Sequence, residues 1–370
     1  MRRLERTDAG IDFVKLLADH SARKGIAEYS ESAIKQFGDE IQRSLTTTAT
    51  ADHRVRGLRA EALFLAVVAG IGKVSLIKAE DNGCVYFTGD DVLVPDFRVI
   101  PSDDNQTLIE VKAHRLDGSF GKYFRLSHNY IQKLREYAAR TKTVLRIAIF
   151  WEEHRLWTLN RVEAFTEGIS GERQWSISFA RALATNEMAL LGDCEIATRA
   201  PLRFRVLIDP EKSDSIPPGS SGSFKMVLAG VQLLSQNRVL SDLSAQIAWK
   251  LLWHGRWEEI RQDFHYEGEQ LLWVDHVFAP PEWDEGESDP AAPVMIGSLS
   301  EMISNAYLSG AEHTIHTTAT DDILQPGYMG NFIPADFVSL NLDLPLFVFI
   351  LQPNFEFQEA KQDQSLPDHR

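Results

Sequence analysis

The chain has 370 residues, of which 44% are hydrophobic and 25% are charged, and its formal net charge is -15. This composition is that of a folded globular protein, and the length allows two or three domains. The two cysteines, Cys84 and Cys194, do not make a disulfide framework or a four-ligand zinc site. The longest apolar run, 62–72, is too short to span a bilayer, and the N-terminal residues lack a signal-peptide core. We therefore expect a cytoplasmic protein with no membrane partner.

The first 165 residues predict a helical arm followed by a compact α/β unit. Residues 1–50 form the arm, because 11–45 has the spacing of two short amphipathic helices. The α/β unit, 51–165, begins with a helix that stops at two glycines, and Ser127 is placed to cap a second helix. The predicted elements of this unit are helices over 53–70 and 127–141 and strands over 74–79, 84–88, 92–100, 107–114, 144–151 and 156–160.

Residues 166–370 predict an additional α+β region whose role the pattern does not define. The segment 209–223 is rich in Gly, Pro and Ser, and we expect a linker there that divides the region. All of the net negative charge lies in 166–370, because residues 1–165 hold slightly more Lys and Arg than Asp and Glu. That charge favours a homo-oligomer or a protein partner over a broad phosphate-binding surface. The predicted elements are strands over 201–208 and 344–353 and helices over 224–235 and 241–262.

Three charged residues interrupt two of the apolar strand runs. Asp96 lies within 92–100, and Glu110 and Lys112 lie within 107–114. A charge inside a buried strand is unfavourable unless it is paired with an opposite charge or bound to a metal. Glu110 and Lys112 are two positions apart on one strand, so they share a face of the sheet.

Two carboxylates and an ammonium group on one surface suit metal-assisted hydrolysis of a phosphodiester. Asp96 and Glu110 are expected to hold Mg2+, with Mn2+ as a possible substitute, because hard cations prefer oxygen ligands. The metal would polarise the phosphate and lower the pKa of a bound water. Lys112 would orient or deprotonate that water, or stabilise the charge that builds up on the phosphate.

This site depends on the register of two neighbouring strands. A six-residue turn over 101–106 places Asp96 opposite Val111 and points it away from Glu110, since opposite residues share a face. A shared site needs Asp96 beside Glu110 or beside Lys112, which is a shift of one residue in either direction. The sequence therefore predicts a register shift or a bulge that bends the first strand at Pro95–Asp96.

The spacing of these residues resembles a known signature. Pro95 and Asp96, thirteen further residues, and then Glu110, Val111 and Lys112 are similar to the motif of the PD-(D/E)xK nuclease superfamily. The resemblance implies a restriction-endonuclease-like core, with a mixed central sheet flanked by helices, over 51–165. It also implies a Mg2+-dependent endodeoxyribonuclease that acts on DNA. Archaeal Holliday junction resolvases belong to the same superfamily, so a structure-specific nuclease is an alternative.

Glu61 is a further candidate for the same site. It lies on the apolar stripe of the helix over 53–70, and no basic residue one turn away can pair with it. A salt bridge to Lys112 or to a distant Arg would satisfy it without metal. In many members of the superfamily a Glu of the first helix points into the metal site, and Glu61 resembles that residue. The resemblance therefore adds Glu61 to Asp96 and Glu110 as a catalytic metal ligand.

A basic strip over 111–146 provides the expected contact with DNA. It holds nine Lys or Arg residues against Asp117 and Glu136. A local basic surface attracts a phosphate backbone even when the total charge is negative, although a solvated helix surface carries the same residue types. The expected nucleic-acid contacts are His114, Arg115, Lys122, Arg125, Gln132 and Lys133.

An alternative of another class is a non-catalytic module that keeps the fold and binds nucleic acid or protein. In that case Lys112 only neutralises Asp96 and Glu110. Metal binding distinguishes the two, because a cluster already neutralised by lysine should not take up Mg2+ or Mn2+.

Overall fold

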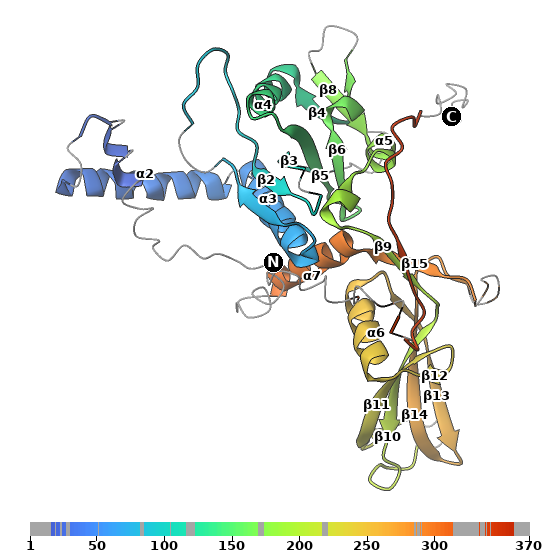
Figure 1. Cartoon of the computed structure of the whole chain (residues 1–370). Coiled ribbons are helices and arrows are strands. Elements are labelled where there is room, and N and C mark those ends of the chain that lie inside the picture. Colours follow the sequence, from blue (N-terminus) through green and yellow to red (C-terminus); the bar gives the residue numbers. More distant parts are fainter. Residues whose placement is uncertain are drawn as a thin grey trace, which may run out of the picture.

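The computed structural model of the chain shows an upper group of strands and helices, a separate sheet at the opposite end, and one long helix that projects from the side (Figure 1). The described residues are 16–18, 20–22, 24–26, 30–50, 52–81, 85–103, 105–115, 123–168, 174–216, 221–284, 286, 289, 291–313, 333, 337, 339–340 and 342–358. Their helices are α2 (Glu31–Thr50), α3 (Asp52–Ile71), α4 (His128–Arg140), α5 (Phe179–Ala184), α6 (Asp242–His254) and α7 (Leu299–His313).

The strands in the first half of the chain are β1 (Leu76–Ala79), β2 (Phe97–Ile100), β3 (Thr107–His114), β4 (Tyr123–Ser127), β5 (Val144–Trp151), β6 (Leu156–Arg161), β7 (Thr166–Glu167) and β8 (Gln174–Ser178). Those in the second half are β9 (Glu195–Thr198), β10 (Leu202–Ile208), β11 (Leu228–Ser235), β12 (Arg238–Val239), β13 (Glu258–Glu267), β14 (Gln270–Ala279), β15 (Val294–Ser298) and β16 (Leu346–Phe349).

The central sheet has the strand order β1-β2-β3-β5-β6. Strands β3 and β5 are parallel, and the other neighbouring pairs are antiparallel. The mixed central sheet expected from the sequence is therefore present. Two of the expected strands differ, because 85–88 lies in the connection between β1 and β2, and β2 begins only at Phe97.

Helices cover both faces of this sheet, as the apolar pattern requires. On one face, α3 contributes Phe64 and Val67 to a core with Ile109 and Val111 of β3. On the other face, the apolar stripe of α4 packs against Leu108 and the odd-numbered residues of β5. Strand β3 is therefore buried from both sides over its first five residues, and a charged residue there must find a partner within the protein.

Helix α4 begins where the sequence places it. Ser127 is the N-cap, and its hydroxyl oxygen accepts a hydrogen bond of 3.2 Å from the amide of Tyr130. This bond satisfies one of the amides that have no partner inside the helix, and it fixes the start of the first turn. The side chain of Tyr130, which lies in that turn, is consequently held near the end of β3.

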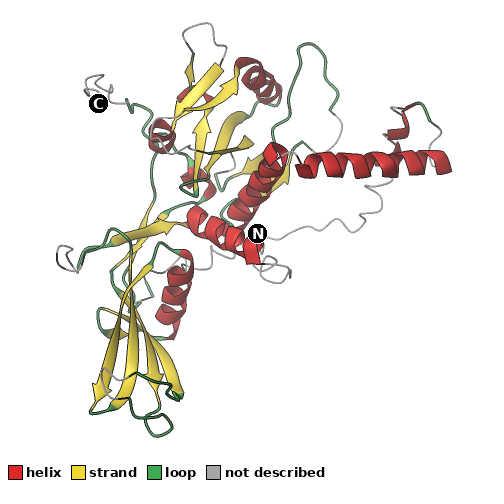
Figure 2. Ribbon diagram, turned by 180° about the vertical axis from the view of Figure 1, so that it is seen from behind, coloured by secondary structure: helices red, strands yellow, loops and turns green. Residues whose placement is uncertain are grey.

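The core of the α/β unit continues past residue 165. Strand β4 pairs with β8, so a small sheet of β4, β8 and β7 crosses that position. Helix α7 packs against α3, and the two helices lie side by side in both views (Figure 1, Figure 2). A Cβ atom at Gly70 would come within 3.1 Å of Ile303 Cδ1, so glycine permits this close approach. The indole of Trp157 also donates a hydrogen bond of 3.1 Å to Ser304 Oγ.

The second half of the chain differs from the expected arrangement at two segments. Residues 209–223 connect β10 to β11, which are antiparallel neighbours in one sheet, so this segment does not divide the region. The expected helix over 224–235 is wrong, because β11 occupies Leu228–Ser235. Only the last three residues of β11 are buried, so its sequence lacks the alternation that would have indicated a strand. The expected helix over 241–262 ends at His254, where β13 soon follows.

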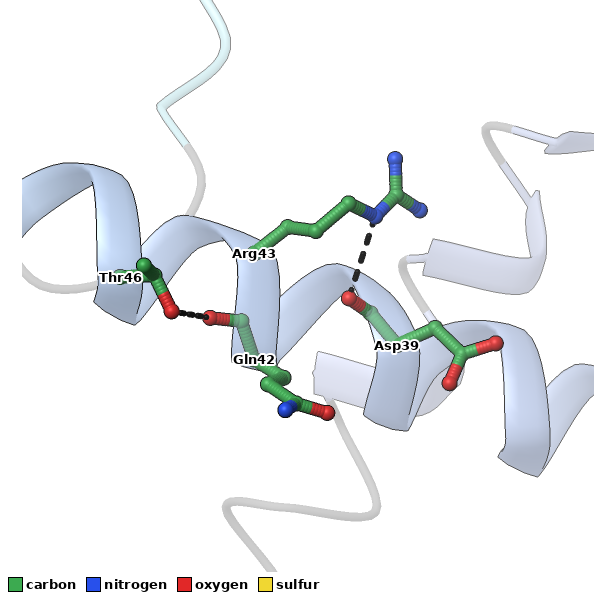
Figure 3. A pocket seen from close by; sticks show the side chains of 4 residues that line it. All are labelled: Asp39, Gln42, Arg43 and Thr46. Carbon is green, nitrogen blue, oxygen red and sulfur yellow. Dashed lines mark hydrogen bonds between the residues drawn. The ribbon is translucent and has the colours of Figure 1, made fainter.

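Helix α2 projects from the body, and residues 1–15 of the expected arm lie outside the described residues. A hollow of about 680 Å³ lies on this helix and is lined by Asp39, Gln42, Arg43 and Thr46 (Figure 3). The side chains of Arg43 and Thr46 donate hydrogen bonds to backbone carbonyls one turn earlier in the same helix.

The described helices include none with the length and apolar character needed to cross a membrane.

Candidate active site

The pairing of β2 with β3 brings Asp96 to the same face as Glu110. Phe97 pairs with Ile109, and Val99 pairs with Thr107. This register differs by one residue from the pairing that a six-residue turn would give. When the same register is extended by one residue beyond the pair of Phe97 and Ile109, Asp96 lies opposite Glu110. The register shift predicted from the sequence is therefore confirmed, and no bulge interrupts the pairing of β2 with β3.

Asp96 is fixed from both sides at the point where β2 begins. Its carbonyl oxygen accepts a hydrogen bond of 2.8 Å from the amide of Glu80, which extends the pairing of β1 with β2 by one residue. Its carboxylate oxygen Oδ2 accepts a hydrogen bond of 2.7 Å from the amide of Val111. The carboxylate therefore accepts a hydrogen bond that a backbone carbonyl would otherwise accept, and this bond holds it against β3.

Burial and the nearby Glu110 raise the pKa of Asp96 to about 7. Lys112 and the Val111 amide act in the opposite direction, and Glu61 adds a smaller repulsion. A carboxyl group with this pKa is one whose negative charge is incompletely compensated by its surroundings.

Glu110 has the lowest exposure of the candidate residues, with 2% of its surface accessible. Its Oε1 atom accepts hydrogen bonds from Lys112 Nζ and from the hydroxyl of Tyr130. Lys112 Nζ also donates to the carbonyl of Val111 at 3.0 Å. Burial alone would lower the pKa of Lys112, but Glu110, Tyr130 and Asp96 together raise it above its usual range.

Tyr130 was not expected at the site from the sequence. Its position in the apolar stripe of α4 suggested a core residue, yet its hydroxyl reaches Glu110 while Lys112 Nζ lies 5.3 Å from the centre of its ring. Burial and Glu110 raise the pKa of Tyr130, so it remains a hydrogen-bond donor at neutral pH. The available signal was its place three residues after the cap Ser127, in the first turn of a helix beside the motif strand.

Glu61 reaches the same group from α3. Burial raises its pKa, Asp81 and Glu110 raise it further, and Lys112 lowers it. These influences show that Glu61 lies within electrostatic range of both Lys112 and Glu110. Asp96, Glu110 and Lys112 thus lie together on the motif strands, and Glu61 on α3 is near enough to influence them electrostatically.

The residue types at this site fit a hard divalent cation. Asp96, Glu110 and Glu61 offer carboxylate oxygens, and a cation held between them would relieve the repulsion that raises the pKa of Asp96. Within the described part of the chain, no group of three or more His, Cys, Asp or Glu side chains is already arranged to hold a metal ion. In this structure Asp96, Glu110 and Glu61 therefore do not form a ready-made cation site.

The expected nucleic-acid contacts fall into three groups. His114 packs edge-on against the rings of Phe124 and Trp151, with ring centres 5.5 and 5.3 Å apart, so its ring is engaged within the protein. Lys133 forms an ion pair of 2.9 Å with Asp91 in the connection that leads to β2. The remaining expected contacts are Arg115, Arg125 and Gln132, which are exposed, and Lys122, which lies outside the described residues.

The solved structures that resemble this chain include a weak likeness to a nuclease. A Holliday junction resolvase (Hjc) of the hyperthermophilic archaeon Archaeoglobus fulgidus is 17% identical in sequence, and the match covers 37% of this chain and 95% of that chain with a TM-score of 0.27. No family model matches the chain, and no curated protein matches it.

The raised pKa of Asp96 leads to a prediction about stability. A group whose pKa is higher in the folded than in the unfolded state contributes stability below its unfolded pKa, near 4, and loses that contribution as pH rises through its folded pKa. We therefore expect metal-free Asp96→Asn to be more stable than the unsubstituted protein at pH 8, by on the order of 2–4 kcal/mol. The difference should shrink as pH falls from 7 towards 4.

Urea unfolding in EDTA at pH 5, 6.5 and 8 measures this difference. Mn2+ should then stabilise the unsubstituted protein more than Asp96→Asn, because ligand that binds only the folded state adds to stability. An Asp96→Asn protein that is less stable at pH 8 would show instead that the carboxylate belongs to a structural ion pair.

Proposed function

We propose that the chain is a metal-dependent nuclease that hydrolyses phosphodiester bonds in DNA. The observation that carries this proposal is the register of β2 against β3, which sets Asp96 beside Glu110 and Lys112 on one face of a mixed sheet. If the pairing differed by one residue, Asp96 and Glu110 would point to opposite faces of the sheet.

In the proposed mechanism, Asp96, Glu110 and Glu61 hold Mg2+. When bound, Mg2+ supplies polarisation of the phosphate and lowers the pKa of a water ligand. Lys112 stays protonated at neutral pH, because its carboxylate neighbours raise its pKa. In this protonated form its ammonium group stabilises the charge that builds up on the phosphate. Tyr130 holds Glu110 in place through its hydroxyl.

The exposed basic residues supply the proposed DNA contact. Arg115 follows β3 directly, Arg125 lies on β4, and Gln132 lies on α4, so all three come from elements next to the site. Arginine contacts to phosphates would position the backbone without reading the base sequence.

One observation favours a second candidate function, a non-catalytic module that binds nucleic acid or protein. Lys112 already contacts the buried carboxylate of Glu110, and this contact compensates the charge without a metal. Direct titration with Mn2+ separates the two functions. A nuclease site binds Mn2+, and binding is weakened in Asp96→Asn, whereas a lysine-compensated module does not bind it.

The test of the proposed function uses three DNA substrates. Supercoiled plasmid, linear duplex and a four-way junction are incubated with the protein in Mg2+, in Mn2+ and in EDTA. We expect cleavage that needs the metal and is abolished in Asp96→Asn. Preference for the junction would identify a structure-specific nuclease. Equal cleavage by the protein and by Asp96→Asn would contradict the assignment of the site.

A further inference from the structure

A network of three side chains lies beside the candidate site and takes no part in the proposed chemistry. Glu80, just after β1, has a side chain that is only 7% exposed. Arg98 holds its carboxylate with two bonds, Nε to Oε2 at 3.1 Å and Nη2 to Oε1 at 2.5 Å. The hydroxyl of Tyr137 on α4 donates to the same Oε1 at 2.8 Å. This Glu80–Arg98–Tyr137 network therefore joins β1, β2 and α4.

Each member of the network has a short connection to a residue of the site. The amide of Glu80 donates to the carbonyl of Asp96, and Arg98 lies two residues after Asp96 on the same face of β2. Tyr137 lies seven residues after Tyr130, which is two helical turns along the same side of α4. The carboxylate of Glu80 thus restrains both the strand that carries Asp96 and the helix that brings Tyr130 to Glu110.

The charges of the network are mutually stabilised. The Arg98 guanidinium lowers the pKa of Glu80, and Glu80 raises the pKa of Arg98. Arg98 also donates to the side chain of Gln106 at 2.8 Å, which anchors it at the turn between β2 and β3. The guanidinium is therefore held by Glu80 and by Gln106, and these bonds limit its movement.

We propose that Glu80 is a positioning residue for the candidate site, and that it acts through Arg98 and Tyr137 to orient Asp96 and to place Tyr130 on Glu110. The catalytic consequence rests on the proposed nuclease function, whereas the effect on Asp96 does not. Outer partners that orient metal ligands commonly change metal affinity or activity by about 10- to 100-fold when they are replaced.

The experiment measures the orientation of Asp96 separately from metal binding and catalysis. The variants are Glu80→Gln, which keeps the shape of the side chain, and Tyr137→Phe, which removes one hydroxyl. The matched control is Glu301→Gln, because Glu301 is also 7% exposed and is held by two bonds from Arg256 at 2.7 and 2.6 Å, away from the motif strands. Hydrogen exchange of the Val111 amide reports the orientation of Asp96, since that amide donates to its carboxylate.

We expect the Val111 amide to exchange at least about 10-fold faster in Glu80→Gln, and less so in Tyr137→Phe, while Glu301→Gln leaves it unchanged. Mn2+ affinity and kcat should fall by about 10- to 100-fold in Glu80→Gln with KM nearly constant. Unchanged exchange at Val111, or the same change in Glu301→Gln, would overturn the proposal. If the unsubstituted protein neither cleaves DNA nor binds Mn2+, the proposed function fails, and the exchange of Val111 still decides whether Glu80 positions Asp96.

Discussion

Lys112→Met is expected to reduce DNA cleavage by about 10²- to 10⁴-fold and to leave Mn2+ binding as tight as before or tighter. The methionine removes the cation that stabilises charge on the phosphate. It also removes a positive charge that competes with the metal for Glu110. Loss of activity without loss of metal is therefore the signature of this residue, whereas replacing a carboxylate ligand removes both.

Cleavage rates at saturating Mn2+ and a calorimetric titration with Mn2+ measure the two effects. Lys212→Met is the matched control, because Lys212 is 70% exposed and pairs with Asp209 within the loop after β10. Its cleavage rate should equal that of the unsubstituted protein. Full activity in Lys112→Met would remove this lysine from the mechanism and leave the non-catalytic module as the better interpretation.

Glu187→Ala is expected to destabilise the protein by about 3–5 kcal/mol, the largest effect we predict outside the site. Glu187 is 3% exposed and accepts from Arg146 at 3.1 and 3.3 Å and from Arg161 at 2.9 Å. Arg146, on β5, is itself buried, and it also donates to Thr107 at 2.8 Å. Removing the carboxylate leaves a buried guanidinium without its counter-charge.

Urea unfolding of Glu187→Ala at neutral pH checks this value. Glu163→Ala is the control, since Glu163 is 70% exposed and its nitrogen–oxygen distance to Arg135 is 3.8 Å. An exposed ion pair of this kind contributes about 0–1 kcal/mol, so the control should change stability little. Similar losses in both variants would mean that the buried network contributes no more than a surface pair.

The sequence predicted the α/β unit well because its signals are local. The periodicity of 53–70 and the Ser127 cap define helices that correspond to α3 and α4 within a few residues. The apolar runs 107–114 and 144–151 match β3 and β5 residue for residue. The register of β2 could be deduced only by assuming that Asp96 and Glu110 share a site, because turn length alone pointed to the other register.

Other parts of the site could not be predicted, because they depend on contacts between distant segments. The hydrogen bond from Tyr130 to Glu110 spans 20 residues, and that from Tyr137 to Glu80 spans 57. Either tyrosine fits an apolar helix stripe when the sequence is considered alone. In the second half, β11 was predicted as a helix because its apolar residues do not alternate regularly with polar ones, which is the pattern that would have indicated a strand.

The packing of α7 on α3 has a consequence for the order in which the chain is made. Helix α3 ends at Ile71, but the residues of α7 that cover it, such as Ile303, leave the ribosome more than 200 residues later. At about 5–20 residues per second, that delay is on the order of 10–50 s. During this interval the apolar side of α3 that later faces α7 is not covered by that helix, so the nascent polypeptide presents a binding surface for chaperones until α7 has been made.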